Sequence, residues 1–288
     1  MMTTIWAGLS IGAIYAIVAI GYNIVFIASR VFNFAQAQFV MIGTFIALEV
    51  GRTFDLPLPL AVLVAALAGG LIGGLEEILA IRRLRGRGAH NELVTTLGVA
   101  TILSGAALLI WGSSPQRLPY FSGDASLSIF GGRVLPVELL MIFSALILAV
   151  VVGIVTRKTM IGLAGLATSE DADAAKLRGI NGGWLALGAF VVAGALLAAV
   201  GPLVGAKTFA IYNLGDLLAV KAFVALAIGG FGSYAGALVG GFAVGLLEAF
   251  AARYIGSEWQ NITVFILLLV ALLAIPQGFF GRRAVRTV

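Results

Sequence analysis

Residues 58–82 read LPLAVLVAALAGGLIGGLEEILAIR, a stretch with no charged side chain before Glu76. About 20 consecutive apolar residues allow an α-helix to cross the hydrocarbon core of a bilayer. Gly70 and Gly74 lie four residues apart, a spacing that lets two helices in a membrane approach closely. The stretch therefore predicts a membrane-spanning helix over 58–81 that packs tightly against a neighbouring helix.

The same apolar pattern recurs along the whole chain. Of its 288 residues, 61% are hydrophobic and 11% are charged, whereas about 25% of the residues in soluble domains are charged. Apolar runs predict nine spans within a range of eight to ten, at 5–28, 33–50, 58–81, 92–111, 136–156, 184–204, 215–231, 235–253 and 260–276. We therefore expect an all-α polytopic membrane protein in which residues 1–288 form one transmembrane domain. The first residues lack a basic segment, so we expect a retained first helix and not a cleaved signal peptide.

The lysines and arginines predict the orientation of these spans. One set of loops carries 12 of the 18 basic residues, the other set carries five, and Lys221 falls within a span. Loops rich in Lys and Arg face the cytoplasm. We therefore expect the N-terminus outside and the C-terminus and residues 157–183 inside, and we expect no nucleic-acid partner. The basic residues of the richer set are Arg30, Arg82, Arg83, Arg85, Arg87, Arg157, Lys158, Lys176, Arg178, Arg282, Arg283 and Arg286.

Residues 69–82 have a partial copy at 240–253, GGFAVGLLEAFAAR. Seven of the 14 aligned positions are identical, and Glu77 aligns with Glu248. The predicted spans that carry the two copies run in opposite directions, which indicates an inverted repeat, a common design of transporters. The predicted repeat halves are about 1–111 and 184–288, with a connector helix at 136–156 and a cytoplasmic coupling segment at 157–183. Chance similarity between two glycine-rich helices is the alternative.

Residues 168–182, TSEDADAAKLRGING, are polar in an otherwise apolar chain. Thr168 or Ser169 can cap a helix at this point, and Gly179 can end it in a left-handed conformation. Acidic residues at the start of the stretch favour the N-terminus of a helix. Because a helix of about ten residues is not stable alone in water, this helix needs a docking surface. On the cytoplasmic side, a soluble partner can provide that surface.

Three stretches resemble one known family. Residues 8–47, GLSIGAIYAIVAIGYNIVFIASRVFNFAQAQFVMIGTFIA, and residues 227–241, AIGGFGSYAGALVGG, resemble the permeases of branched-chain amino acid ABC transporters. Residues 173–179, DAAKLRG, are similar to the "EAA…G" coupling loop of ABC importer permeases. The resemblance covers most of the chain, and the first two stretches are the specific ones.

This resemblance implies one membrane subunit of a larger importer, with no catalytic residue of its own. The implied partners are a second homologous permease, two cytoplasmic ATP-binding subunits, a periplasmic solute-binding protein and the lipid of the bacterial inner membrane. ATP and magnesium would be held by the ATP-binding subunits, so no cofactor is expected in this chain. The residues expected to couple the chain to the ATPase are Glu170, Asp171, Asp173, Ala174, Ala175, Arg178 and Gly179.

Irregular backbone at membrane depth is tolerated only where it is buried in protein or lines a cavity, and we expect such helix breaks at Asn33–Gln38 and in the glycine-rich segment 229–236. Polar side chains in the first of these segments and around the start of the span at 215–231 are the candidates for the translocation pathway. Unpaired amides are costly in lipid, so they should face protein or water; the alternative is that they only satisfy the backbone at the breaks. The candidates are Asn33, Gln36, Gln38, Asn213 and Asp216. Gln36, Ala37 and Gln38 stand where the family usually has histidine, glycine and glutamate. The cargo therefore stays open between a branched-chain or related amino acid and urea, an amide or an aromatic acid.

The glutamates near the ends of spans have a structural explanation. We expect Glu76 and Glu77 to pair with Arg82 and Arg83, which follow within two turns, and Glu248 to pair in the same way with the arginine at 253. The functional alternative for the first two is a contact with the ATPase or a gate.

Lys221 lies about six residues into its predicted span. A lysine at this depth can extend its side chain to the outer interface, and we expect it to do so. Facing the pathway or pairing with Asp216 is the alternative.

Several chemical functions are excluded by the sequence. It has no Gly-x-x-x-x-Gly-Lys-Ser/Thr motif, no cysteine and one histidine, so we expect no ATPase, no enzyme and no metal site in this chain. The alternative to an importer subunit is a self-contained secondary transporter or channel for a small solute, which often has inverted repeats too. Such transporters place ionisable residues deep in the membrane. Because Lys221 is the one strong candidate for such a residue, the importer subunit is favoured.

Overall fold

The computed structural model describes residues 1–84, 89–120, 126–275 and 278–281. The long helices are α1 (Met2–Ser29), α2 (Gln38–Thr53), α3 (Leu58–Glu76), α4 (Ala89–Trp111), α5 (Pro136–Lys158), α8 (Gly182–Thr208), α9 (Leu214–Gly229), α10 (Tyr234–Tyr254) and α11 (Gln260–Ala274). The short elements are the helices α6 (Met160–Glu170) and α7 (Ala172–Leu177), the 3₁₀ helices η1 (Phe34–Ala37) and η3 (Ser257–Trp259), the π-helix η2 (Glu77–Ile81), and the strands β1 (Leu127–Ile129) and β2 (Gly132–Val134). Five arginines of the orientation argument lie outside the described residues: Arg85, Arg87, Arg282, Arg283 and Arg286.

The predicted class, an all-α polytopic membrane protein, is confirmed. Eight helices in the described part of the chain are long and apolar enough to cross a membrane. They correspond to eight of the nine predicted spans. The remaining one, predicted at 215–231, is α9, whose 16 residues are fewer than the roughly 20 that a crossing takes.

The chain forms two compact units. Unit 1 comprises Met1–Asn23, Asp124–Gly153 and Val220–Val288, and unit 2 comprises Ile24–Gly123 and Ile154–Ala219. The sequence boundaries between the units fall inside α1, α5 and α9 and in the loop between α4 and α5. Each unit therefore combines helices from both predicted repeat halves.

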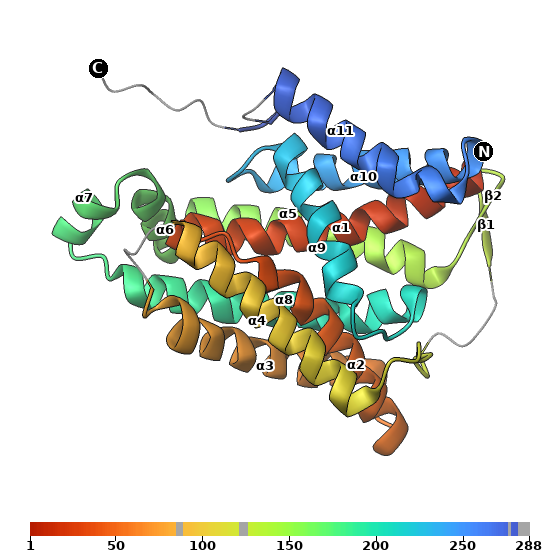
Figure 1. The fold of residues 1–288 in the computed structure, drawn as a ribbon, viewed down its shortest axis with the longest axis horizontal. Coiled ribbons are helices and arrows are strands. Elements are labelled where there is room, and N and C mark those ends of the chain that lie inside the picture. Colours follow the sequence, from red (N-terminus) through yellow and green to blue (C-terminus); the bar gives the residue numbers. More distant parts are fainter. Residues whose placement is uncertain (85–88, 121–125, 276–277, 282–288) are drawn as a thin grey trace. The chain divides into compact units, whose positions relative to one another are not determined.

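The core of unit 2 is a close contact between α3 and α8, with α2 packed against both (Figure 1). A Cβ atom added to Gly69 would lie 2.5 Å from the carbonyl oxygen of Gly194, and one added to Gly194 would overlap the carbonyl of Gly69. No side chain fits between backbones at this separation. The predicted helix over 58–81 thus packs tightly on a neighbouring helix, but its closest contacts are made by Gly69 and Gly73 and not by the predicted pair Gly70 and Gly74. Its last turn widens into the π-helix η2.

In unit 1, α10 packs on α1 through another backbone contact. A Cβ atom on Gly12 would lie 2.7 Å from the carbonyl oxygen of Gly241. The loop between α9 and α10 lies within the predicted irregular segment 229–236, and its Gly230 and Gly232 have positive φ angles. Asn23 of α1 holds this loop: its amide donates to the carbonyl of Ser233 at 3.0 Å and accepts from the N–H of Gly232 at 2.8 Å.

The stretch 112–135, predicted as a loop, holds a short hairpin that the sequence analysis missed. Phe130 and Gly131 both have positive φ angles, as a two-residue turn between twisted strands requires. The sequence Phe130-Gly131-Gly132 could have predicted this turn, since glycine readily adopts a positive φ angle. Trp6 of α1 donates its indole N–H to the carbonyl of Ile129 at 3.3 Å, which ties the hairpin to unit 1.

The glycine contact in unit 2 can be tested by Gly194→Ala. We expect the added methyl group to push α8 from α3 and to lower the free energy of unfolding by about 1–3 kcal/mol, measured by thermal unfolding in detergent. Gly188→Ala on the same helix is the control, because a Cβ atom there meets nothing within 4 Å. Equal unfolding temperatures for the two variants would contradict the role given to this contact.

Candidate functional site

A helix break follows α1 and positions the first set of candidate residues. Asn33 has an extended backbone, and its side-chain oxygen accepts from the N–H of Ala35 at 2.9 Å. This cap starts the 3₁₀ turn of η1, which leads directly into α2. The irregular backbone predicted over Asn33–Gln38 is therefore present. Asn33, Gln36 and Gln38 are all buried.

The structure brings together four of the five candidate pathway residues in two pairs. The amide of Asn33 donates to the side-chain oxygen of Gln36 at 3.0 Å, and the amide of Gln38 donates to Asp216 at 2.6 Å. The second carboxylate oxygen of Asp216 accepts from the hydroxyl of Ser104 at 3.3 Å. Ser104 was not predicted. Asn213 lies in the turn before α9, and its buried side-chain oxygen has no partner. Their role in transport stays a prediction.

The pair of Gln38 and Asp216 also explains the short α9. Near the far end of α2, Arg52 contacts Gln116, which bridges to Ala210. Gln38 lies 14 residues from Arg52, about 21 Å along α2. Since only six residues separate Ala210 from Asp216, the chain before α9 must run back along α2 to reach Gln38. The helix α9 therefore begins beside the first residue of α2, with Asp216 in its first turn.

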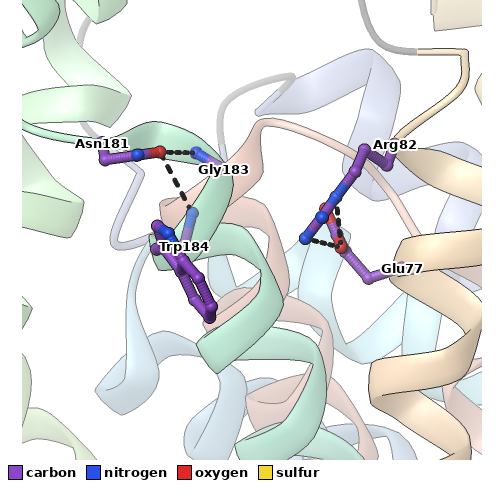
Figure 2. Close-up of polar contacts among 5 residues, drawn as sticks. All are labelled: Glu77, Arg82, Asn181, Gly183 and Trp184. Carbon is purple, nitrogen blue, oxygen red and sulfur yellow. Dashed lines mark hydrogen bonds and ion pairs between the residues drawn. The ribbon is translucent and has the colours of Figure 1, made fainter.

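Glu76 is a site residue that the sequence analysis assigned wrongly. Glu77 does pair with Arg82, at 2.9 Å (Figure 2), but Glu76 accepts a hydrogen bond from Asn33 at 2.9 Å instead. The π-helix is the reason: the N–H of Arg82 bonds to the carbonyl of Glu77 five residues earlier, so Arg82 lies over Glu77 and not over Glu76. A signal was available, because Glu76 continues the buried face of α3 that contains Gly69 and Gly73.

This cluster holds polar atoms without partners. They are Nε2 of Gln36, Oε1 of Gln38, Oε1 of Glu76 and Oδ1 of Asn213. A buried polar atom that lacks a hydrogen bond costs about 1–3 kcal/mol, so each of these atoms favours a water or a small polar molecule as its partner. The site can therefore bind a small polar molecule. Among the described residues, no group of three His, Cys, Asp or Glu side chains is placed to hold a metal ion.

In unit 1, Lys221 pairs with Glu248, and Glu248 does not pair with Arg253 as predicted. Lys221 binds Oε1 of Glu248 at 2.5 Å, and the hydroxyl of Tyr15 donates to Oε2 at 2.6 Å. Arg253 donates to Thr4 instead. The reason is tertiary: α9, α10 and α1 place their three polar side chains together, so the lysine and the glutamate neutralise each other. The alternative pairing of Lys221 with Asp216 is also wrong, because Asp216 is bound to Gln38 and Ser104.

The ion pair of Lys221 and Glu248 predicts how substitutions change the stability of the protein. Lys221→Met leaves Glu248 as an unpaired buried charge, and we expect a loss of about 3 kcal/mol in thermal unfolding in detergent. The double variant Lys221→Met/Glu248→Gln removes both charges and should recover most of this loss. A double variant no more stable than the single one would show that the ion pair is not the source of the effect.

The polar segment predicted at 168–182 is two helices, and its predicted cap is wrong. Thr168 and Ser169 lie inside α6. Asp171 is instead the N-cap of α7, with its carboxylate accepting from the N–H groups of Asp173 and Ala174. Its extended backbone (φ −147°) breaks the helix between α6 and α7. Gly179, with φ +84°, ends α7 as predicted.

The segment is anchored at both ends within unit 2. Arg30, just after α1, donates to the carbonyl of Glu170 at 3.1 Å. Asn181 caps α8, with its side-chain oxygen accepting from Gly183 and Trp184 at 3.0 and 3.3 Å (Figure 2). A pocket of about 920 Å³ lies between the end of α1 and the segment. The helix α7 itself lies beyond the end at which α8 begins (Figure 1).

Most of the predicted coupling residues are exposed. They are Glu170, Asp171, Asp173, Ala174, Arg178 and Gly179, whereas Ala175 is buried and anchors α7. Leu177, which the sequence analysis did not name, is 89% exposed on α7. This leucine is exposed on a helix of six residues, which is too short to be stable alone in water.

Residues 4–272 match the family described as Branched-chain amino acid transport system / permease component. The chain belongs to this family. It is 32% identical over 298 residues to the high-affinity branched-chain amino acid transport system permease protein BraD of Pseudomonas aeruginosa, covering 98% of this chain and 96% of BraD. It is 28% identical to LivH of Escherichia coli, with the same coverage. The predicted resemblance is confirmed.

A more distant relative agrees with this assignment, and one solved structure has a similar fold. The probable branched-chain amino acid transport permease protein LivH of Methanocaldococcus jannaschii is 27% identical, covering 92% of this chain and 88% of the relative. A chain of PsaBC from Streptococcus pneumoniae in complex with Fab matches with a TM-score of 0.50 and 13% identity, covering 95% of this chain and 92% of that one. The second match concerns the fold alone. The protein is thus a multi-pass membrane permease component.

Proposed function

We propose that the chain is one of two membrane subunits of an ATP-driven importer for a branched-chain or related amino acid. A second homologous permease would complete the membrane part, two cytoplasmic subunits would bind ATP and magnesium, and a periplasmic protein would deliver the solute. Family membership and the names of the relatives support this proposal. Urea, an amide or an aromatic acid are the alternative cargoes.

The observation that carries the proposal is the exposed segment of α6 and α7. It is polar, too short to fold alone, and ends in the exposed side chain of Leu177. A cleft on an ATP-binding subunit would cover this leucine and complete the helix. An ion-driven transporter that works alone has no need of such a surface.

The contacts of the segment suggest how movement reaches the membrane part. Glu170 is bonded to Arg30, which lies three residues before Asn33, the cap of η1. Asn181 connects the other end of the segment to α8, which packs on α3. Movement of α7 by an ATPase would therefore act on both α8 and η1, the elements that enclose the polar cluster. Solute would pass along Asn33, Gln36, Gln38, Asn213 and Asp216 as these elements separate.

The coupling role predicts the effect of Leu177→Asp. A charge at the apolar tip should weaken co-purification with the ATP-binding subunits at least tenfold, because about 1.4 kcal/mol corresponds to a factor of ten and burying an unpaired charge costs more. Solute-stimulated ATP hydrolysis should fall in parallel. Phe130→Asp is the control, since Phe130 is 83% exposed on the β-hairpin, far from α7 in the sequence. An unchanged complex for Leu177→Asp, or solute transport by the isolated subunit, would favour the secondary transporter.

The proposed location is the bacterial inner membrane, with the N-terminus outside and the C-terminus in the cytoplasm. The chain has no cysteine, so single-cysteine variants need no prior engineering. We expect Ser114→Cys to react with a membrane-impermeant maleimide in intact spheroplasts. We expect Ala172→Cys, next to Asp171 on the coupling segment, to react only in inside-out vesicles. The reverse pattern would place α7 outside and exclude contact with a cytoplasmic ATPase.

A further inference from the structure

Two adjacent glutamates of unit 2 differ in their partners. Glu77 is neutralised by Arg82 at 2.9 Å. Glu76 is 5% exposed, and its hydrogen bond is to the neutral amide of Asn33 at 2.9 Å. Carboxylates within membrane spans are costly and usually functional. Among the described residues, Glu76 therefore has no cationic partner of the kind that its neighbour has.

The atoms around Glu76 leave one acceptor and one donor free. Asn33 joins the two side chains, since its amide nitrogen donates to Oε2 of Glu76 and to Oε1 of Gln36. Oε1 of Glu76 and Nε2 of Gln36 are both buried and have no partner. Asn33 itself is fully used, because its oxygen caps η1. Asn33 is thus a positioning residue, and Glu76 and Gln36 are the groups that can bind a guest.

The backbone on both sides of this pair is irregular. Gln36 lies in the 3₁₀ helix η1, and Glu76 immediately precedes the π-helix η2. Segments of 3₁₀ and π-helix inside longer helices often mark functional hinges or sites. Both elements contact α4 and α8, so a shift of α8 changes the space between the two side chains.

We propose that Glu76 and Gln36 recognise the ammonium group and the carboxylate of an amino acid in transit. The ammonium group would donate to Oε1 of Glu76 and supply the missing positive charge. The carboxylate of the solute would accept from Nε2 of Gln36. This inference rests on the proposed function and narrows it: urea, simple amides and aromatic acids without an amine do not provide the cation. Because both side chains are buried, the solute would reach them only while the surrounding helices are apart.

The test is Glu76→Gln in the complete transporter, reconstituted in proteoliposomes with its partner subunits and its binding protein. The variant keeps the size of the side chain and removes its charge. We expect ATP-dependent uptake of radiolabelled L-leucine to fall at least tenfold, as for loss of a buried charge contact. We expect the melting temperature in detergent to stay the same or rise, because an unpaired buried carboxylate destabilises the free protein.

Three further variants keep the test decisive. Glu77→Gln is the matched control, since it removes a paired carboxylate and should lower the melting temperature. Gln36→Met should reduce leucine uptake about tenfold through loss of one hydrogen bond to the charged carboxylate of the solute, and it should lower the melting temperature only slightly, through loss of the bond from Asn33. Glu76→Asp keeps the charge and should restore part of the uptake lost in Glu76→Gln.

The outcomes separate this inference from the proposed function. If the unmodified transporter takes up no L-leucine, the proposed cargo is wrong. If it takes up L-leucine and Glu76→Gln does so equally well, the proposed function stands and the role of Glu76 is refuted. A lower melting temperature for Glu76→Gln, with uptake reduced only in proportion to the folded protein, would show that Glu76 is structural.

Discussion

Direct contact between helix backbones is the constraint on which both units depend. In a bilayer, lipid tails are as apolar as leucine, so helices associate through close packing and not through the hydrophobic effect. In unit 2 the contact of Gly69 with Gly194 holds α3 on α8, and in unit 1 Gly12 and Gly241 hold α1 on α10. These contacts place the polar residues of one helix beside those of the next. The buried glutamates on α3 and α10 lie one or two turns from these glycines.

Polar groups inside the units are satisfied in two different ways. Glu248 is neutralised by Lys221 and also accepts from Tyr15, and Glu77 is neutralised by Arg82. These carboxylates are complete without a ligand, and they stabilise their units. The cluster around Asn33 is incomplete, with free polar atoms on its two neighbours. A protein that moves a polar solute needs such incomplete positions, because a fully satisfied site has no free donor or acceptor for a guest.

The predicted inverted repeat remains a prediction, but the two units share one pairing. Unit 2 joins α8, the first span of the second predicted half, to α3, the third span of the first half. Unit 1 joins α1, the first span of the first half, to α10, the third span of the second half. The same two positions are therefore paired in both units, with the halves exchanged. The glycines that make these contacts are not at equivalent positions of the repeat. Gly69 of unit 2 aligns with Gly240, whereas the glycine that contacts Gly12 in unit 1 is Gly241. The helix faces have therefore diverged, although the aligned glutamates Glu77 and Glu248 are both buried and paired.

The sequence by itself determined the class of the protein, eight of its nine predicted spans to within a few residues, the irregular backbone within 33–38 and 229–236, and the family. These features depend on apolar run length, glycine position and local motifs, which are read along the chain. It also singled out Gln38 and Asp216, because unpaired polar groups in a span must face protein or water. Only the tertiary structure decided the partners. Lys221 pairs with Glu248, which is 27 positions away in the sequence, and Glu76 pairs with Asn33, which is 43 positions away. A side chain from another helix competes with every possible partner that is near in the sequence. The π-turn after Glu76, which directs Arg82 to Glu77, is a backbone conformation that residue spacing alone does not predict.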